Sequence, residues 1–84
     1  MAQKTELRKI PGVGEAIEKR LLLLGYTTVA SLKGQDPQQM YQRDMALSGA
    51  PLDRCLLYVY RLAVYFAENK THDAEKLKWW NWKD

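Results

Sequence analysis

Apolar residues recur with a helical period in three stretches of this chain. In the first stretch, Ile17, Leu21 and Leu24 follow one another at i, i+4 and i+7. This spacing predicts a helix from about Gly14 to Leu24 with one buried face. Gly25 then stands where glycine commonly ends a helix.

The other two periodic stretches lie in the second half of the chain. Asp36 and Pro37 combine an N-cap residue with proline at the first helical position, and predict a helix that ends near Ser48 and Gly49. Pro51 predicts the start of a longer and more apolar helix. The inward faces predicted for these two helices are Met40, Tyr41, Met45 and Leu47, and then Leu52, Leu56, Val59, Ala63 and Phe66.

Shorter elements are expected between and around these helices. Thr5 is the predicted cap of a short first helix, which must stop before Pro11 because proline cannot continue a helix. Thr28 is the predicted cap of one turn over residues 29–32, and a last short helix is expected from about Asp73. The predicted fold is therefore all-α, with about five to six short helices.

The length and composition limit the architecture to one small domain. The 84 residues, 46% of them hydrophobic, can form a single globule. We expect one domain over residues 1–84, with the tryptophan-rich tail of residues 69–84 packed on it. No membrane association is expected, because the apolar run over residues 55–67 is interrupted by Arg61 and a bilayer span needs about 20 residues. The lone Cys55 and the lack of a leader favour the cytoplasm.

Two glycines one residue apart follow a proline in the segment Ile10-Pro11-Gly12-Val13-Gly14. Glycine accepts positive φ and has no Cβ, so this segment can turn tightly and let the backbone approach a ligand. Free N–H groups at the start of the next helix would lie at its positive end, an arrangement that binds phosphate. The segment resembles the helix-hairpin-helix motif of sequence-nonspecific DNA-binding proteins, with Leu7, Ile10, Val13, Ile17 and Leu21 as its packing residues.

The net charge of +3 lies entirely in residues 1–34, which hold six basic and three acidic residues. An excess of basic residues around the hairpin is typical of a phosphate-facing surface, although ordinary solvated surface is the alternative. Glu15 and Glu18 depart from the DNA-binding pattern, because acidic residues in the first helical turn compete with a phosphate for the same positive field. The candidate phosphate-binding residues are Arg8, Lys9, Gly12, Val13, Gly14, Lys19 and Arg20.

A second, degenerate hairpin is visible at Leu47-Ser48-Gly49-Ala50-Pro51, which precedes a helix and lacks the second glycine. Paired motifs of this kind bury apolar faces that one helix pair leaves exposed. We therefore interpret the second copy as structural.

Four stretches between Thr5 and Asp84 together resemble the bacterial pathogenicity-locus family. They are LRKIPGVG, SLKGQDPQQMY, ALSGAPLDRCLLYVYRLAVYFA and KWWNWKD. The resemblance implies a helix-hairpin-helix fold and carries no established activity.

Aromatic residues suggest where a partner could bind. All three tryptophans lie in the last six residues, where they can stack on bases, anchor a partner protein or fold back to complete the core. The last interpretation is favoured, because exposed indoles promote aggregation, and Trp80 is expected to be the exposed one. The long helix is apolar on more than one face, so it is either central in the fold or partly covered by another subunit. The second alternative predicts a homodimer through Tyr58, Leu62 and Tyr65. The candidate partner-binding residues are Tyr58, Tyr65 and Trp80.

The sequence offers little for catalysis. His72 lies in a polar stretch and Cys55 in an apolar one, and neither has the context of a catalytic triad or a metal site. We therefore expect no enzyme activity and no cofactor or metal. The leading hypothesis is a sequence-nonspecific protein that binds double-stranded DNA through backbone phosphates. The alternative is a protein-interaction module in which the hairpin is purely structural.

Overall fold

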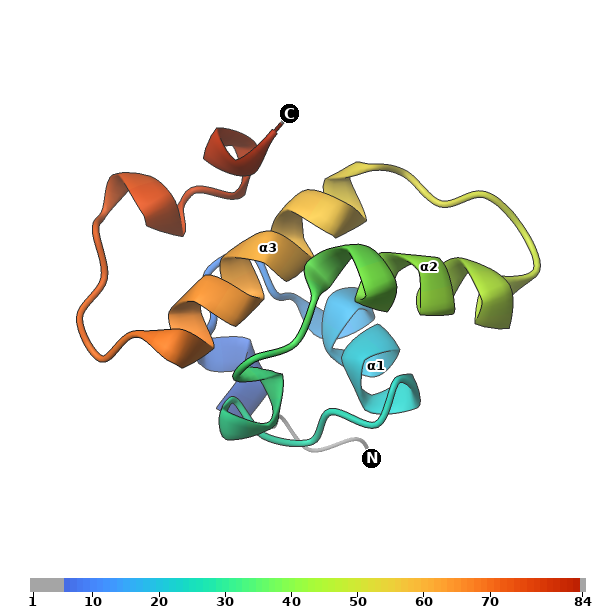
Figure 1. Cartoon of the computed structure of the whole chain (residues 1–84), viewed down its shortest axis with the longest axis horizontal. Helices are drawn as coiled ribbons and strands as arrows, with labels where there is room; N and C mark the ends of the chain where they lie inside the picture. Colours follow the sequence, from blue (N-terminus) through green and yellow to red (C-terminus); the bar gives the residue numbers. More distant parts are fainter. Residues whose placement is uncertain (1–5, 84) are drawn as a thin grey trace.

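The computed structural model describes residues 6–83, and this part of the chain is helical without strands. Its α-helices are α1 (Glu15–Leu23), α2 (Pro37–Ser48) and α3 (Cys55–Glu68), and α3 crosses the middle of the molecule (Figure 1). The predicted all-α class is confirmed, although most of the short helices are single 3-10 turns. These are η1 (Glu6–Lys9), η2 (Ala30–Leu32), η3 (Glu75–Leu77) and η4 (Trp79–Trp82). Thr5, the predicted first cap, lies outside the described residues.

The ends of α1 and α2 follow local sequence signals. After α1, Gly25 has a φ of +97°, its N–H donates to Leu22 O, and the Tyr26 N–H donates to Leu21 O. This pair of hydrogen bonds is a Schellman motif, which needs a left-handed residue and therefore favours glycine. At the start of α2, the Gln38 N–H donates to Asp36 Oδ1 at 2.9 Å, as expected of an N-cap aspartate.

The third helix begins later than predicted. Pro51 was expected to open it, but the structure starts α3 at Cys55, and residues 50–53 belong to the connection. The reason is Asp53, whose Oδ1 accepts from the Cys55 N–H at 2.9 Å and whose carbonyl accepts from the Leu56 N–H. A side-chain acceptor satisfies a first-turn N–H group, which proline cannot do.

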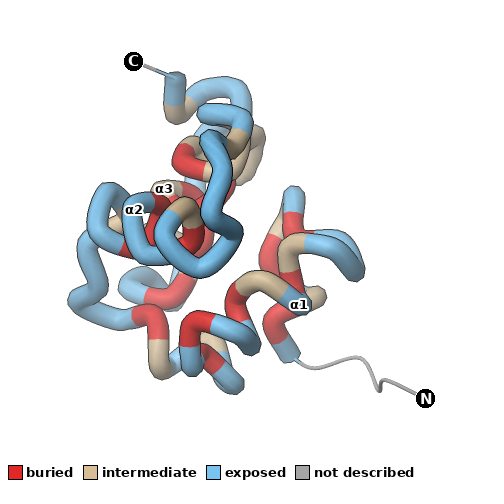
Figure 2. The backbone as a smooth tube through the Cα atoms, turned by 90° about the vertical axis from the view of Figure 1, so that its right-hand side faces the viewer, coloured by how far each residue is buried: buried red, intermediate tan, exposed pale blue. Residues whose placement is uncertain are grey.

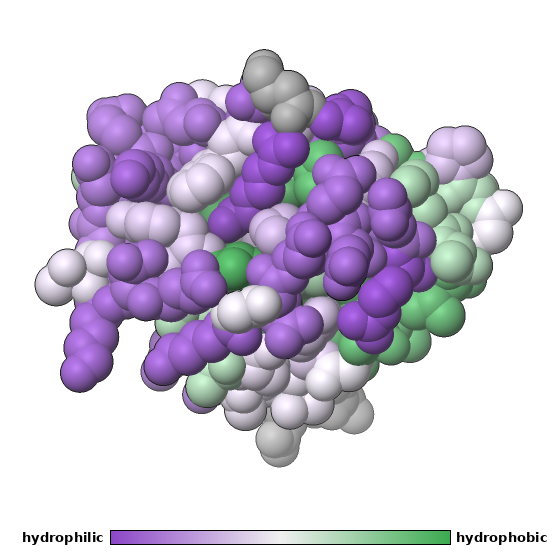
Figure 3. Space-filling view, viewed as in Figure 1, coloured by the Kyte–Doolittle hydropathy of each residue, from purple (hydrophilic) through white to green (hydrophobic). Residues whose placement is uncertain are grey.

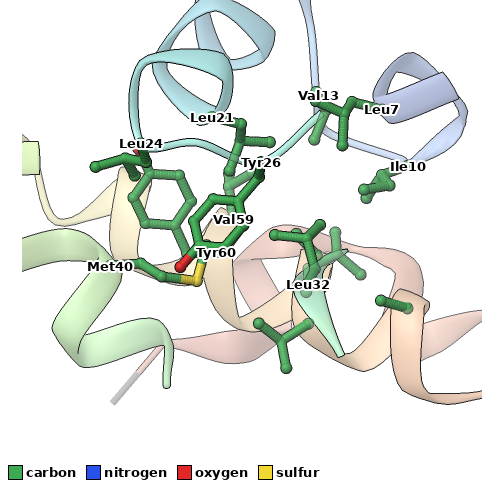
Figure 4. Packing of buried hydrophobic residues seen from close by; sticks show 14 of the residues in the cluster. Leu7, Ile10, Val13, Leu21, Leu24, Tyr26, Leu32, Met40, Val59 and Tyr60 are labelled. Carbon is green, nitrogen blue, oxygen red and sulfur yellow. The ribbon is translucent and has the colours of Figure 1, made fainter. Parts of the chain in front are cut away.

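The core forms around α3. Figure 2 shows buried residues where the tubes of the three α-helices face one another and exposed residues on the outer turns. In Figure 4, Leu7, Ile10 and Val13 lie at one end of the buried cluster, with Leu24 and Met40 at the other. In the stripe predicted for this helix, Val59 and Ala63 are buried, while Leu52, Leu56 and Phe66 are partly buried and pack against the core. The buried surface of α3 is wider than one stripe, because this helix is covered on several sides. Its buried residues are Leu57, Val59, Tyr60, Leu62, Ala63, Val64 and Ala67.

A carboxylate occupies the buried face of α2. Met40 and Tyr41 are buried as predicted, but Leu47 is 65% exposed, whereas Asp44 is only 3% exposed. The Tyr60 O–H donates to Asp44 Oδ2 at 2.5 Å, and Arg20 Nη1 donates to Oδ1 at 2.9 Å. Burial, and then the bond to Asp44, raise the pKa of Tyr60, so that its hydroxyl stays protonated and donates. The Asp44 cluster, defined as Arg20, Asp44 and Tyr60, therefore joins all three α-helices.

Removal of the Tyr60 hydroxyl should destabilise the fold. In Tyr60→Phe, the buried carboxylate of Asp44 loses a donor, and we expect a loss of about 1–3 kcal/mol in the free energy of unfolding, measured by urea denaturation. The matched control is Tyr58→Phe, since the Tyr58 hydroxyl accepts only a long 3.4 Å contact from Arg54 Nε on an exposed part of the surface. Equal losses in the two variants would contradict a special role for the Asp44 cluster.

Candidate functional site

The hairpin of residues 10–14 is a compact turn anchored from below. The Ile10 N–H donates to Leu7 O and the Val13 N–H donates to Ile10 O, each at 3.1 Å. Leu7, Ile10 and Val13 are all buried, so Val13 is a core residue (Figure 4). The packing predicted for these three residues is therefore confirmed.

The two glycines of the hairpin differ in conformation. Gly12 has a φ of +86°, which L side chains rarely adopt, whereas Gly14 has a φ of −96° and an extended backbone. A side-chain carbon at Gly12 would lie 3.6 Å from Trp79 Cδ1, and one at Gly14 would have no heavy atom within 4 Å. Gly12 is thus needed for its backbone conformation, while Gly14 leaves open space at the start of α1.

The start of α1 has no cap of its own. Gly14 is the N-cap residue and has no side chain to accept a hydrogen bond, and the first helical bond is from the Glu18 N–H to Gly14 O. The N–H groups of Glu15, Ala16 and Ile17 therefore have no acceptor within residues 6–83. In α2 and α3, by contrast, aspartates accept from first-turn N–H groups. An external anion can fill the place left open at α1.

Both acidic residues of the first turn are held by basic neighbours. Glu18 is only 4% exposed, and its Oε1 accepts from Arg8 Nε at 3.2 Å. Glu15 forms an exposed ion pair with Lys19 at 3.5 Å. The negative charges of Glu15 and Glu18 beside the hairpin are therefore largely compensated within the protein. The positive charges of Arg8 and Lys19 are compensated by the same ion pairs.

Among the predicted phosphate-binding residues, Arg20 is the one that the structure places elsewhere. Arg20 lies in the last turn of α1, away from the hairpin, and its Nη1 donates to Asp44 Oδ1 and to Ser48 Oγ of α2. The buried charge of Asp44 requires this partner, so Arg20 is a structural residue. Lys9, at the end of η1, is exposed and makes no ion pair within residues 6–83.

The predicted homodimer face of α3 is covered by the chain itself. Leu62 is fully buried, so it cannot contact a second subunit in this structure. Tyr65 is half-buried, with its ring 5.5 Å from that of Trp82 and its hydroxyl bound to the Asp73 N–H. The ring of Tyr58 lies beneath the guanidinium of Arg61 at 5.7 Å. The C-terminal tail returns along α3 and packs against Tyr65 through Trp82 (Figure 1).

The two residues considered for catalysis have structural contacts. The His72 ring stacks on Phe66 with centroids 4.3 Å apart. A hydrogen bond to the Asp53 side chain raises the pKa of the Cys55 thiol. The described residues contain no cluster of three metal-ligating side chains.

One pocket of about 320 Å³ lies away from the hairpin, between α3, the start of α2 and the tail. Arg61 and Glu68 both line it, so the pocket does not favour a ligand of one particular charge. Its lining residues are Gln35, Pro37, Arg61, Val64, Tyr65, Glu68 and Trp82. Within residues 6–83, no helix has the length and hydrophobicity of a membrane span.

Comparison with known proteins places this chain in a family. The model of the family described as "Pathogenicity locus" matches residues 1–84, so the chain belongs to that family. It is 31% identical over 78 residues to the mitomycin resistance protein McrB of Streptomyces lavendulae, an alignment that covers 93% of this chain and 70% of the relative. No solved structure matches.

Substitution of the two hairpin glycines should have different effects on stability. We expect Gly12→Val to lose about 1–3 kcal/mol in the free energy of unfolding, because a β-branched residue would be forced to a positive φ. Gly14→Ala is the matched control and should be nearly neutral, since its φ is ordinary and the space around it is open. Urea denaturation measures both. A tolerated Gly12→Val would show that the turn can form another way.

Proposed function

We propose that this protein binds double-stranded DNA through backbone phosphates, without reading base sequence. The hairpin of residues 10–14 and the first turn of α1 would form the phosphate site of a helix-hairpin-helix motif. The observation that carries the proposal is the uncapped start of α1, whose N–H groups lack an acceptor beside an exposed Gly14. The ion pairs of Glu15 and Glu18 support it, because they reduce the repulsion that a phosphate would meet there.

The proposed site is small, so the binding should be weak. One uncapped helix turn and Lys9 can contact two or three phosphates, which corresponds to a slope of roughly −2 to −3 in log K against log salt concentration. No helix of the described chain is expected to enter a groove and read base edges, since the contacts come from backbone N–H groups and a lysine. Any preference would therefore concern DNA structure rather than sequence.

The name of the relative from Streptomyces lavendulae associates it with resistance to mitomycin and states no molecular partner. The DNA-binding proposal consequently depends on the hairpin and on the measurement below.

The direct test is an amide NMR titration of the full chain with a short duplex at low salt. We expect chemical-shift changes concentrated at residues 12–18, and an affinity that falls as salt is added, with the slope of roughly −2 to −3 given above. If these amides do not move at any salt concentration, the proposal is wrong.

Reversal of one charge should weaken the same binding. Lys9→Glu removes an unpaired cation beside the hairpin, and we expect a five- to tenfold weaker Kd at low salt and a salt slope reduced by about 1. The matched control is Lys33→Glu, because Lys33 is also exposed and lies outside the hairpin, after η2, where the Gly34 N–H donates to Glu68. If both variants weaken binding equally, only the net charge matters and the hairpin site is unsupported.

A second candidate function is a protein-interaction module, and exposed leucines favour it. Leu23 is 75% exposed, and Figure 3 shows hydrophobic surface gathered on the right-hand side, over the end of α2 and the loop after it. Leu23 and Leu47 each follow one member of the Arg20–Asp44 pair by three residues, so they lie one helical turn from that contact. Solvent-exposed leucines on neighbouring helices are typical of interfaces, and two copies would bring two hairpins to one DNA.

Self-association through these leucines can be measured directly. Light scattering should show a mass that rises above 9.8 kDa with concentration in the unmodified chain and stays at that value in Leu23→Glu. The substitution is at an exposed position, so the fold should be unaffected, as circular dichroism would verify. A mass of one chain at every concentration would exclude the self-association form of this second candidate.

A further inference from the structure

The three tryptophans of the tail have different environments. Trp79 and Trp82 are partly buried and pack against the core, whereas Trp80 is 50% exposed. The side chain of Trp79 lies over the hairpin, 3.6 Å from the place where a Cβ at Gly12 would be. The tail is therefore docked on the hairpin by one indole, while the next indole remains in solvent.

Trp80 lies next to the proposed phosphate site through this contact. Its ring is edge-to-face with that of Trp79, with centroids 5.7 Å apart and planes at 87°. Since the Trp79 side chain lies beside Gly12, the exposed indole is one ring away from the hairpin. A cation also lies near the hairpin, because Lys83 Nζ is above the Trp79 ring, 6.0 Å from the ring centroid.

The arrangement combines the two elements that bind unpaired nucleic acid. Basic and N–H groups hold the backbone, and an exposed aromatic face accepts a base. A base inside a duplex is already stacked on both sides and cannot offer its face to Trp80. An unpaired base next to a bound phosphate can do so, whatever its sequence, because every base has a π-face.

We propose that Trp80 is a base-stacking residue, through which the protein prefers DNA that carries unpaired bases beside a duplex, such as an overhang or a gap. This inference rests on the proposed phosphate site, since the hairpin must first hold the backbone. The three tryptophans then have separate roles: Trp79 joins the tail to Gly12, Trp82 packs along α3, and Trp80 contacts the ligand.

The test compares two DNAs with the full-length chain. Fluorescence anisotropy would measure Kd for a blunt duplex and for the same duplex with a four-nucleotide overhang. We expect the overhang to bind about tenfold more tightly, because one stacked base is worth roughly that factor. Trp80→Ala should lose this preference and keep the blunt-duplex affinity, while Trp80→Tyr should retain part of it. Leu22→Ala, also at an exposed apolar position but assigned to neither proposed surface, is the matched control and should behave as the unmodified chain does.

The possible failures can be told apart. If the unmodified chain binds both DNAs equally and in a salt-dependent manner, the stacking inference is overturned and the phosphate site stands. If neither DNA binds, the proposed function fails and the inference fails with it. If Trp80→Ala leaves both affinities unchanged but alters the mass measured by light scattering, the exposed indole belongs to a protein interface, and base stacking is rejected. Circular dichroism of each variant verifies that it is folded.

Discussion

The buried carboxylate of Asp44 constrains the rest of the structure. A charge that is almost fully buried is stable only with close partners, and Asp44 takes one from α1 and one from α3. Both neighbouring helices must therefore keep a set distance and rotation relative to α2. The same requirement excludes Arg20 from the proposed phosphate site, because its guanidinium is hydrogen-bonded to Asp44. A packing constraint thus decides which cations remain at the surface for a ligand.

The electrostatics of the hairpin follow a similar logic. Glu18 is nearly buried and is paired with Arg8, so its carboxylate stabilises the contact between η1 and α1 instead of facing an incoming anion. The negative residues at the start of α1 are therefore compatible with a phosphate site, although each uses one nearby cation. What remains exposed is a set of backbone N–H groups and Lys9. Such a site has little charge and depends on geometry, which makes the conformation of Gly12 more important than any single side chain.

The C-terminal tail links the core to this surface. It returns along α3, covers the face that would otherwise need a second subunit, and contacts the hairpin through Trp79. Small domains have few residues with which to bury a central helix, so a tail rich in large aromatic residues supplies area efficiently. Because the tail and the hairpin touch, a change in either should be felt by the other. This contact joins residues that are more than sixty positions apart in the sequence.

Local signals in the sequence determined the helices and the turn. The periodicity of residues 17–24, the Asp36 cap and the glycines after α1 and α2 correctly predict the limits of two helices, because caps and left-handed residues act within a few positions. The all-α class and the buried Leu7, Ile10 and Val13 could likewise be read from the pattern. The start of α3 at Cys55 differs from the predicted start at Pro51, because the Asp53 side chain accepts from the Cys55 N–H. Only the tertiary structure decided that Arg20 and Tyr60 meet at Asp44, and that Leu62 and Trp79 both lie beside Gly12. Those contacts join segments distant in sequence, and no local preference specifies which distant partner a buried charge or an aromatic ring will find.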